Sequence, residues 1–142
     1  MFAIAAAAGL VIAGCGEGAP GMVLGAEDYK QQVNDLCGSL NADFEQLTGE
    51  ADDDAETLAA LLPKLEDRNR EFLELTPPDE LKDAGDSLAL SNQEQLAATQ
   101  AAADAAEADD QKAYRFALAE LERVEAERDE RATELGAEDC AG

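Results

Sequence analysis

Apolar residues recur every three or four positions along most of the chain after residue 28, and this period is the strongest constraint on the fold. In the first such stretch the apolar residues are separated by four, three, four, four and three positions: Tyr29, Val33, Leu36, Leu40, Phe44 and Leu47. This spacing places their side chains on one face of an α-helix, and Gly49 is a typical stop after it. The chain must therefore bury its apolar side chains by packing helices against one another.

A second helix is predicted to follow Asp52-Asp53-Asp54 and to run to Thr76. The aspartates supply an N-cap and favourable negative charge to the first helical turn. Pro63 lies inside this helix, where proline removes a backbone hydrogen bond and clashes with the preceding turn. We therefore expect a kink or a break near residues 59–63.

Pro77 and Pro78 end the second helix and precede a third, predicted from Asp79 to Ala106, which has a weak apolar stripe and is rich in alanine. A fourth helix is predicted to begin after a cap at Asp109 or Asp110 and to end at Leu135-Gly136. Four helices joined by short links predict an all-α fold, an antiparallel up-down four-helix bundle. In that topology the first and fourth helices are neighbours.

The net charge of −23, from 33 acidic and 10 basic residues, limits the partners of the chain. Nucleic-acid binding depends on Lys and Arg that neutralise phosphates, so we expect no nucleic-acid partner. Disorder is a second reading of high charge, but 46% hydrophobic residues at helical spacing favour a folded chain. A folded acidic surface also suits a cation-binding protein or a saline habitat, where salt screens the repulsion.

The N-terminus carries an apolar run from Met1 that closes on Ile12-Ala13-Gly14-Cys15. This end resembles the lipobox of bacterial lipoproteins, which implies that residues 1–14 are a signal peptide and that Cys15 is lipidated. Residues 15–26 then form a flexible tether, and 27–142 form the helical domain. The run is too short to span a bilayer, and plain secretion or a buried apolar helix are the other readings. No Lys or Arg precedes the run, which a true start upstream of Met1 would explain.

If Cys15 carries lipid, Cys37 and Cys140 remain as a pair, and export makes a disulfide between them chemically reasonable. Two free buried thiols are the alternative. Cys140 reaches Cys37 only if the C-terminal tail folds back or the helix ends are staggered. Together with Pro77-Pro78, these three cysteines resemble the layout of small Ala-rich helical lipoproteins predicted in actinobacterial genomes, a resemblance that implies no known activity.

Candidate sites are few, and none predicts an enzyme. The chain has no histidine, which removes Ser–His and Cys–His pairs and most transition-metal ligation. Carboxylates are numerous enough for a two-carboxylate hydrolase, but they occur in runs typical of exposed segments. No cofactor is predicted.

Two weaker sites concern binding. Asp52, Asp53 and Asp54 offer oxygen ligands for Ca²⁺, although they lack EF-hand spacing and serve equally as a solvated helix cap. Asn69, Asn92 and Gln95 are candidates to line a polar ligand-binding cavity, although such residues are more often satisfied by neighbours or buried water.

We therefore expect a lipid-anchored bundle on the extracytoplasmic face of the cell membrane. Its expected role is that of a non-catalytic binding or envelope-associated module, with the membrane and an envelope protein as partners. The alternative is a lipoprotein that binds a small ligand or Ca²⁺.

Overall fold

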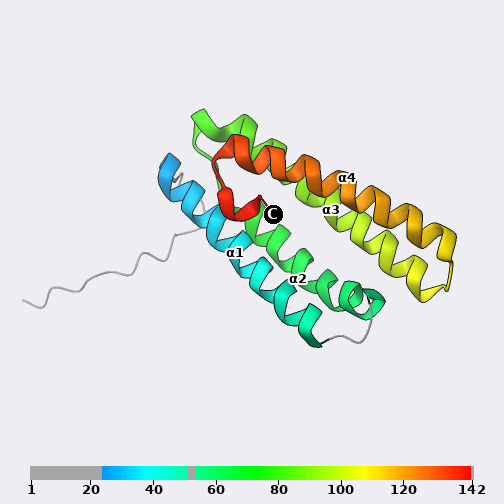
Figure 1. The fold of residues 1–142 in the computed structure, drawn as a ribbon. Coiled ribbons are helices and arrows are strands. Elements are labelled where there is room, and N and C mark those ends of the chain that lie inside the picture. Colours follow the sequence, from blue (N-terminus) through cyan, green and yellow to red (C-terminus); the bar gives the residue numbers. More distant parts are fainter. Residues whose placement is uncertain (1–23, 51–53, 142) are drawn as a thin grey trace, which may run out of the picture.

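The computed structural model describes residues 24–50 and 54–141, and every regular element in those residues is helical (Figure 1). The elements follow the order α1 (Ala26–Glu50), α2 (Asp54–Glu74), η1 (Asp79–Leu81), α3 (Lys82–Glu107), α4 (Gln111–Leu135) and η2 (Glu138–Cys140). The all-α prediction is confirmed. The predicted signal peptide, Cys15 and the tether up to residue 23 lie outside the described residues, as do Asp52 and Asp53.

The predicted limits of α4 are confirmed by its cap geometry. The side chain of Asp110 accepts hydrogen bonds from the backbone N–H groups of Lys112 (3.1 Å) and Ala113 (3.0 Å). Gly136 ends the helix with φ of 79°, a left-handed conformation that glycine adopts without a Cβ penalty. Local sequence therefore sets both ends of this helix.

Helix α2 is continuous through Pro63, so a break, one of the two outcomes predicted near residues 59–63, does not occur. Proline at this position leaves the carbonyl of Ala59 without its helical donor. Both Pro63 and Ala59 are exposed, so water can hydrogen-bond that carbonyl. Because Pro63 lies on the solvent side of α2, the helix can continue past it without a break.

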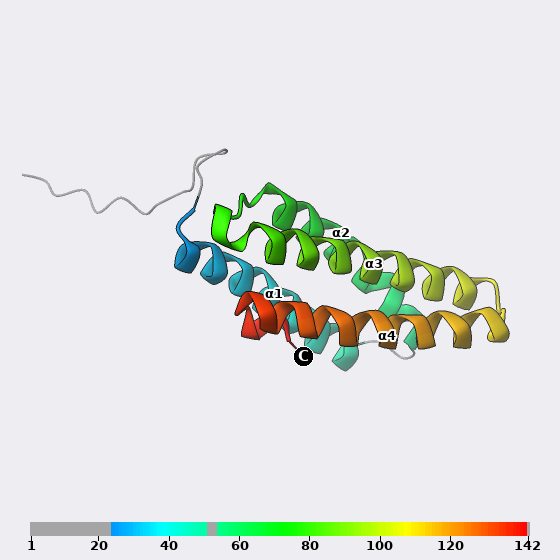
Figure 2. The same ribbon diagram turned by 90° about the horizontal axis from the view of Figure 1, so that it is seen from above.

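The helices pack unevenly around their common axis. The contact between α3 and α4 is the most extensive, followed by α2 with α3 and α1 with α2. Helices α1 and α4 make little direct contact, and η2 packs against both of them at one end (Figures 1 and 2). The expectation that the first and fourth helices pack together as neighbours is therefore wrong along most of their length.

Two apolar clusters form the core, one toward each end of the molecule. The larger unites all four helices and η2, and its buried members include Tyr29, Val33, Phe72, Leu88 and Leu135. The smaller joins Leu58, Ala102 and Ala117 near the far end of the α3–α4 hairpin. Between the clusters the buried residues are partly polar, and this middle layer contains the candidate site described below.

The predicted disulfide between Cys37 and Cys140 is confirmed, with a Cα–Cα distance of 5.0 Å. The tail after α4 folds back, as the geometry required, and two side chains of α1 hold its backbone. Asn41 donates to the carbonyl of Asp139 (2.9 Å), and the N–H of Asp139 donates to Asn34 Oδ1 (3.0 Å). Covalent and polar contacts together fix the C-terminal end against α1.

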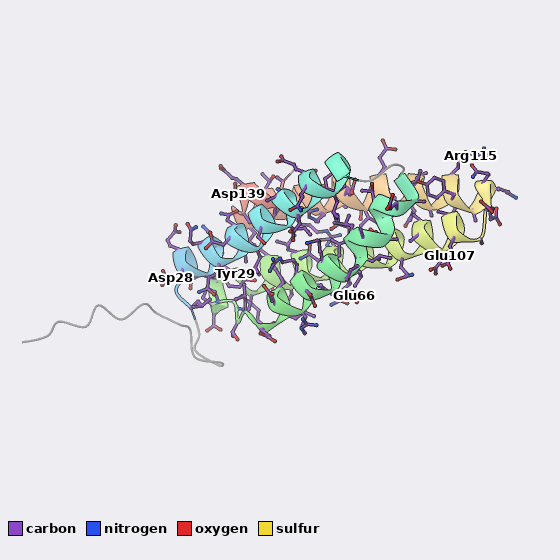
Figure 3. All side chains as sticks on the ribbon, turned by 90° about the horizontal axis from the view of Figure 1, so that it is seen from below. Asp28, Tyr29, Glu66, Glu107, Arg115 and Asp139 are labelled. Atoms are coloured by element: carbon purple, nitrogen blue, oxygen red, sulfur yellow. A yellow bond between two sulfur atoms is a disulfide. The ribbon has the colours of Figure 1, made fainter. Side chains whose placement is uncertain are left out.

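The outer surface is acidic, and charged side chains such as Glu66, Glu107 and Arg115 project from it (Figure 3). Within residues 24–50 and 54–141, no helix is both long enough and apolar enough to cross a membrane.

Candidate ligand-binding cleft

A cleft of about 240 Å³ opens between α1 and α4, midway between the two apolar clusters. These two helices make little direct contact, and α2 and α3 also contribute to the lining of the cleft. Nine residues from all four helices line it: Leu40, Asn41, Phe44, Leu61, Leu65, Gln95, Glu125, Arg128 and Asp129.

The lining is apolar on one side and polar on the other. Leu40 and Phe44 of α1 and Leu61 and Leu65 of α2 form the apolar side. Phe44 is 45% exposed, so part of its ring is open to solvent at the cleft. Apolar walls with a few polar groups are typical of small-molecule sites.

Arg128 is the central polar residue of the cleft and is only 8% exposed. Its Nη1 donates to Gln95 Oε1 at 3.3 Å, and its Nη2 donates to the carbonyl of Cys140. No carboxylate in the described part of the chain forms an ion pair with it. Burial lowers the pKa of Arg128, which the nearby charges of Asp129 and Glu125 partly oppose. The fold therefore holds a buried guanidinium with hydrogen bonds but no contacting counter-ion, a costly arrangement.

Glu125 lies one helical turn before Arg128 and faces the same cleft. Burial raises the pKa of Glu125, while a hydrogen bond from Gln95 and the charge of Arg128 act in the opposite direction. The negative charges of Asp129 and Glu122 add to the rise. The protein around this carboxylate therefore disfavours its charged form.

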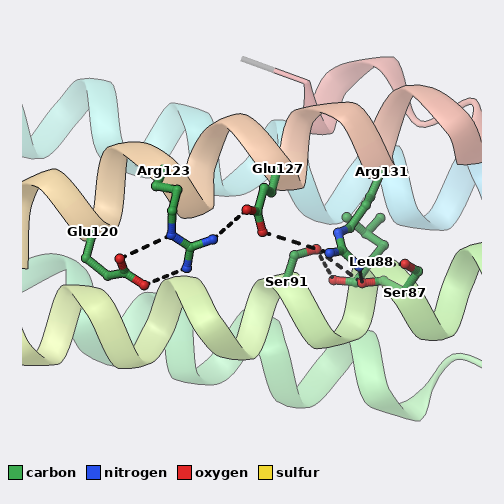
Figure 4. A network of polar contacts seen from close by, with 7 residues as sticks. All are labelled: Ser87, Leu88, Ser91, Glu120, Arg123, Glu127 and Arg131. Atoms are coloured by element: carbon green, nitrogen blue, oxygen red, sulfur yellow. Dashed lines mark hydrogen bonds and ion pairs between the residues drawn. The ribbon is translucent and has the colours of Figure 1, made fainter.

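Two other arginines of α4, Arg123 and Arg131, differ from Arg128 in their pairing. Arg123 contacts Glu120 and Glu127, each at 2.5 Å, and the hydrogen bonds that it donates to these carboxylates raise its pKa (Figure 4). Arg131 pairs with Glu127 at 3.9 Å, as its spacing predicts, and donates to Ser87 Oγ at 2.7 Å. This network joins α4 to α3, so these two arginines have a structural role in which carboxylates balance their charge. Arg128 has no such carboxylate partner among the described residues.

A smaller cavity of about 30 Å³ shares four lining residues with the cleft: Leu40, Leu65, Gln95 and Arg128. The three predicted residues Asn69, Asn92 and Gln95, from α2 and α3, all line this cavity. Asn69 Oδ1 is buried and has no hydrogen-bond partner. A space of this volume holds about one water molecule, which would satisfy that acceptor.

Arg128 and Glu125 were not among the residues predicted from the sequence. The signal for Arg128 lies in its position, four residues after Val124 and seven before Leu135. Those intervals place it on the apolar face of α4, where a charge needs an explanation. Glu125 carries no such signal, because carboxylates surround it in the sequence.

The described residues contain no group of three side chains suited to hold a metal ion. Asp54 is the first residue of α2, whereas Asp52 and Asp53 precede the described part of that helix.

Comparison of the chain with known proteins found no matching protein-family model, no similar curated protein and no similar solved structure.

Proposed function

We propose that this protein is a small-ligand-binding module held at the extracytoplasmic face of the cell membrane by a lipid on Cys15. The observation that carries the binding role is the cleft between α1 and α4, where a buried guanidinium without a contacting counter-ion lies beside apolar walls. Natural ligand sites combine these features.

Two observations support the proposed location. The sequence Ile12-Ala13-Gly14-Cys15 closes an apolar run, as in bacterial lipoproteins. The other two cysteines, Cys37 and Cys140, pair in a disulfide, which suits an oxidising compartment outside the cytoplasm.

We further propose that the domain is an antiparallel up-down bundle opened along the α1–α4 side. The short links between helices and the course of the ribbon in Figure 1 support this topology. Opening of one side explains how a bundle of this size leaves room for a cleft.

The proposed role is non-catalytic. The chain has no histidine to act as a general base for a nucleophile. Arg128 is engaged by Gln95 and the Cys140 carbonyl, a setting suited to binding charge.

Thermal denaturation with a panel of metabolites and Ca²⁺ tests the binding role, because a ligand of the folded state raises the melting temperature. Phe44→Ala removes an aromatic wall of the cleft and is expected to abolish the shift. Phe116 is 77% exposed and lies outside the cleft, so Phe116→Ala is expected to keep the ligand-induced rise in melting temperature. A Ca²⁺ shift lost in Asp52→Asn/Asp53→Asn/Asp54→Asn would instead favour cation binding.

Metabolic labelling with a fatty-acid analogue tests the anchor. The full chain is expected to incorporate label and to sediment with membranes, whereas Cys15→Ser does neither. An unlabelled wild-type protein in the soluble cytoplasmic fraction would contradict the proposed location.

A second candidate role, presentation to an envelope protein, is favoured by Phe116. The end of the α3–α4 hairpin extends past the ends of α1 and α2 (Figures 1 and 2), and Phe116 is exposed on it. Under this role, Phe116→Ala is expected to weaken the complex with the envelope protein, and Phe44→Ala is expected to leave that complex intact. The reverse pattern supports the cleft.

A further inference from the structure

Charges of both signs line the cleft, and none of them has an ion partner within residues 24–50 and 54–141. Arg128 lies between Glu125 and Asp129 along α4, at spacings of three residues and one. Residues three or four apart on a helix have Cβ atoms about 5–6 Å from each other, which makes Arg128 and Asp129 both neighbours of Glu125. All three side chains line the cleft, so they form one patch. Among the described residues, none of the three forms an ion pair.

The patch discriminates between classes of charged ligand. A simple anion would neutralise Arg128 but would be repelled by the Glu125 and Asp129 carboxylates. A simple cation would be drawn to those carboxylates and repelled by the guanidinium beside them. A zwitterion can place each of its charges against the opposite charge of the protein, so it satisfies groups that the fold leaves uncompensated.

The apolar residues of the cleft supply a surface for hydrocarbon. Leu61, Leu65 and Phe44 line the same cleft as the charged groups, and its volume of about 240 Å³ is enough for a small molecule rather than a polymer. A ligand that pairs its two charges with α4 can therefore bury an apolar body against α1 and α2.

Building on the proposed ligand-binding function, we propose that the cleft binds a small zwitterion with an apolar body, of which a free apolar amino acid is the simplest example. Its carboxylate contacts the Arg128 guanidinium, and its ammonium group lies against Glu125 and Asp129. Its hydrocarbon chain packs on Leu61, Leu65 and Phe44.

Calorimetry with three matched compounds tests this proposal on the folded domain with its disulfide intact. L-norleucine carries both charges, hexanoate lacks the amine, and pentylamine lacks the carboxylate. We expect norleucine to bind at least about tenfold more tightly than either fragment, the factor that corresponds to one charge-assisted hydrogen bond. Equal or tighter binding of a fragment would overturn the zwitterion proposal.

Substitutions at the patch test the assigned contacts. The double variant Glu125→Gln/Asp129→Asn is expected to weaken the binding of norleucine at least about tenfold, because the attraction for the ammonium group is lost. Hexanoate is then expected to bind more tightly than norleucine. Arg128→Lys is expected to weaken the binding of norleucine and of hexanoate and to leave the affinity for pentylamine unchanged. Glu130→Gln on the exposed side of α4 is the charge-matched control and is expected to bind like wild type. Unchanged norleucine affinity in the double variant would overturn the proposal.

Failure of this proposal differs from failure of the proposed function. If a fragment binds best and Phe44→Ala abolishes its binding, the cleft is a ligand site of another class. If neither these compounds nor the wider metabolite panel binds, the binding function fails as well.

Discussion

At the scale of single residues, Gly85 of α3 leaves room for the ring of Tyr29 from α1. A Cβ atom at this position would lie 2.7 Å from the hydroxyl oxygen of Tyr29 and 3.3 Å from Pro77 Cβ. Tyr29 is 1% exposed and belongs to the main core cluster, so its ring has little room to move. A side chain larger than hydrogen therefore forces neighbouring groups apart.

We predict that Gly85→Ala lowers the free energy of unfolding by about 1–3 kcal/mol, the usual cost of overpacking a core. Gly38→Ala in α1 is the matched control, because an added Cβ there meets nothing within 4 Å. This second variant is expected to be more stable than wild type by up to about 1 kcal/mol through helix propensity. Urea denaturation measures both, and equal effects would contradict the close approach.

Glu125 is predicted to make stability depend on pH in a specific direction. Burial raises its pKa in the folded state above the ordinary value of 4.5, so the folded protein holds this proton more tightly than the unfolded chain. The destabilising effect of its charge is therefore absent below about pH 4.5 and complete above the folded-state pKa. We expect Glu125→Gln to be more stable than wild type near neutral pH.

Urea denaturation as a function of pH checks this expectation. The advantage of Glu125→Gln should shrink as the pH falls and should vanish below about 4.5, where the wild-type carboxyl becomes protonated in both states. Glu130→Gln makes the same charge change on α4 outside the cleft. An identical pH profile for the two variants would show that general charge repulsion, rather than the cleft, is responsible.

At the scale of the helices, α4 depends on the cap at Asp110, whose carboxylate accepts two backbone hydrogen bonds of the first turn. We predict that Asp110→Ala costs about 1 kcal/mol of stability, as at other N-caps, and that Asp110→Asn costs little because its amide oxygen caps equally well. Urea midpoints compare the three proteins. A large loss in Asp110→Asn would point to a role for the negative charge instead of the hydrogen bonds.

Helix limits followed from the sequence because the signals that set them are local. Asp110 and Gly136 mark the ends of α4 through their own backbone and side-chain chemistry, and the apolar spacing from Tyr29 to Leu47 is contained in α1. Pro63 did not break α2, although an interior proline often ends a helix, because the cost of such a proline depends on whether the freed carbonyl reaches water. That depends on which face of α2 the other helices cover.

At the scale of the whole molecule, the Cys37–Cys140 disulfide ties the two ends of the described chain across a sequence separation of 103 residues. Closing a loop of that length restricts the unfolded chain and stabilises the fold by about 4–5 kcal/mol in a chain-entropy estimate. We predict a loss of that order when Cys37 and Cys140 are both replaced by alanine, measured by urea denaturation. The same variant in reductant is the control, since it should show no further change. A wild-type protein that is equally stable with and without reductant would contradict the prediction.

The sequence by itself determined that the chain is helical and where most helices begin and end, because these depend on local spacing. It predicted the Cys37–Cys140 pair only on the premise that Cys15 carries lipid, and the tertiary structure decided that this pair forms. The tertiary structure alone also decided that α1 and α4 make little direct contact and that Arg128 and Glu125 line the cleft between them. The physical reason lies in the pattern of the helices. An apolar stripe indicates that one face of a helix is buried, but many arrangements of the four helices bury that face equally well. The long-range packing of α3 on α4, with η2 held to α1, selects the arrangement that leaves a charged cleft open.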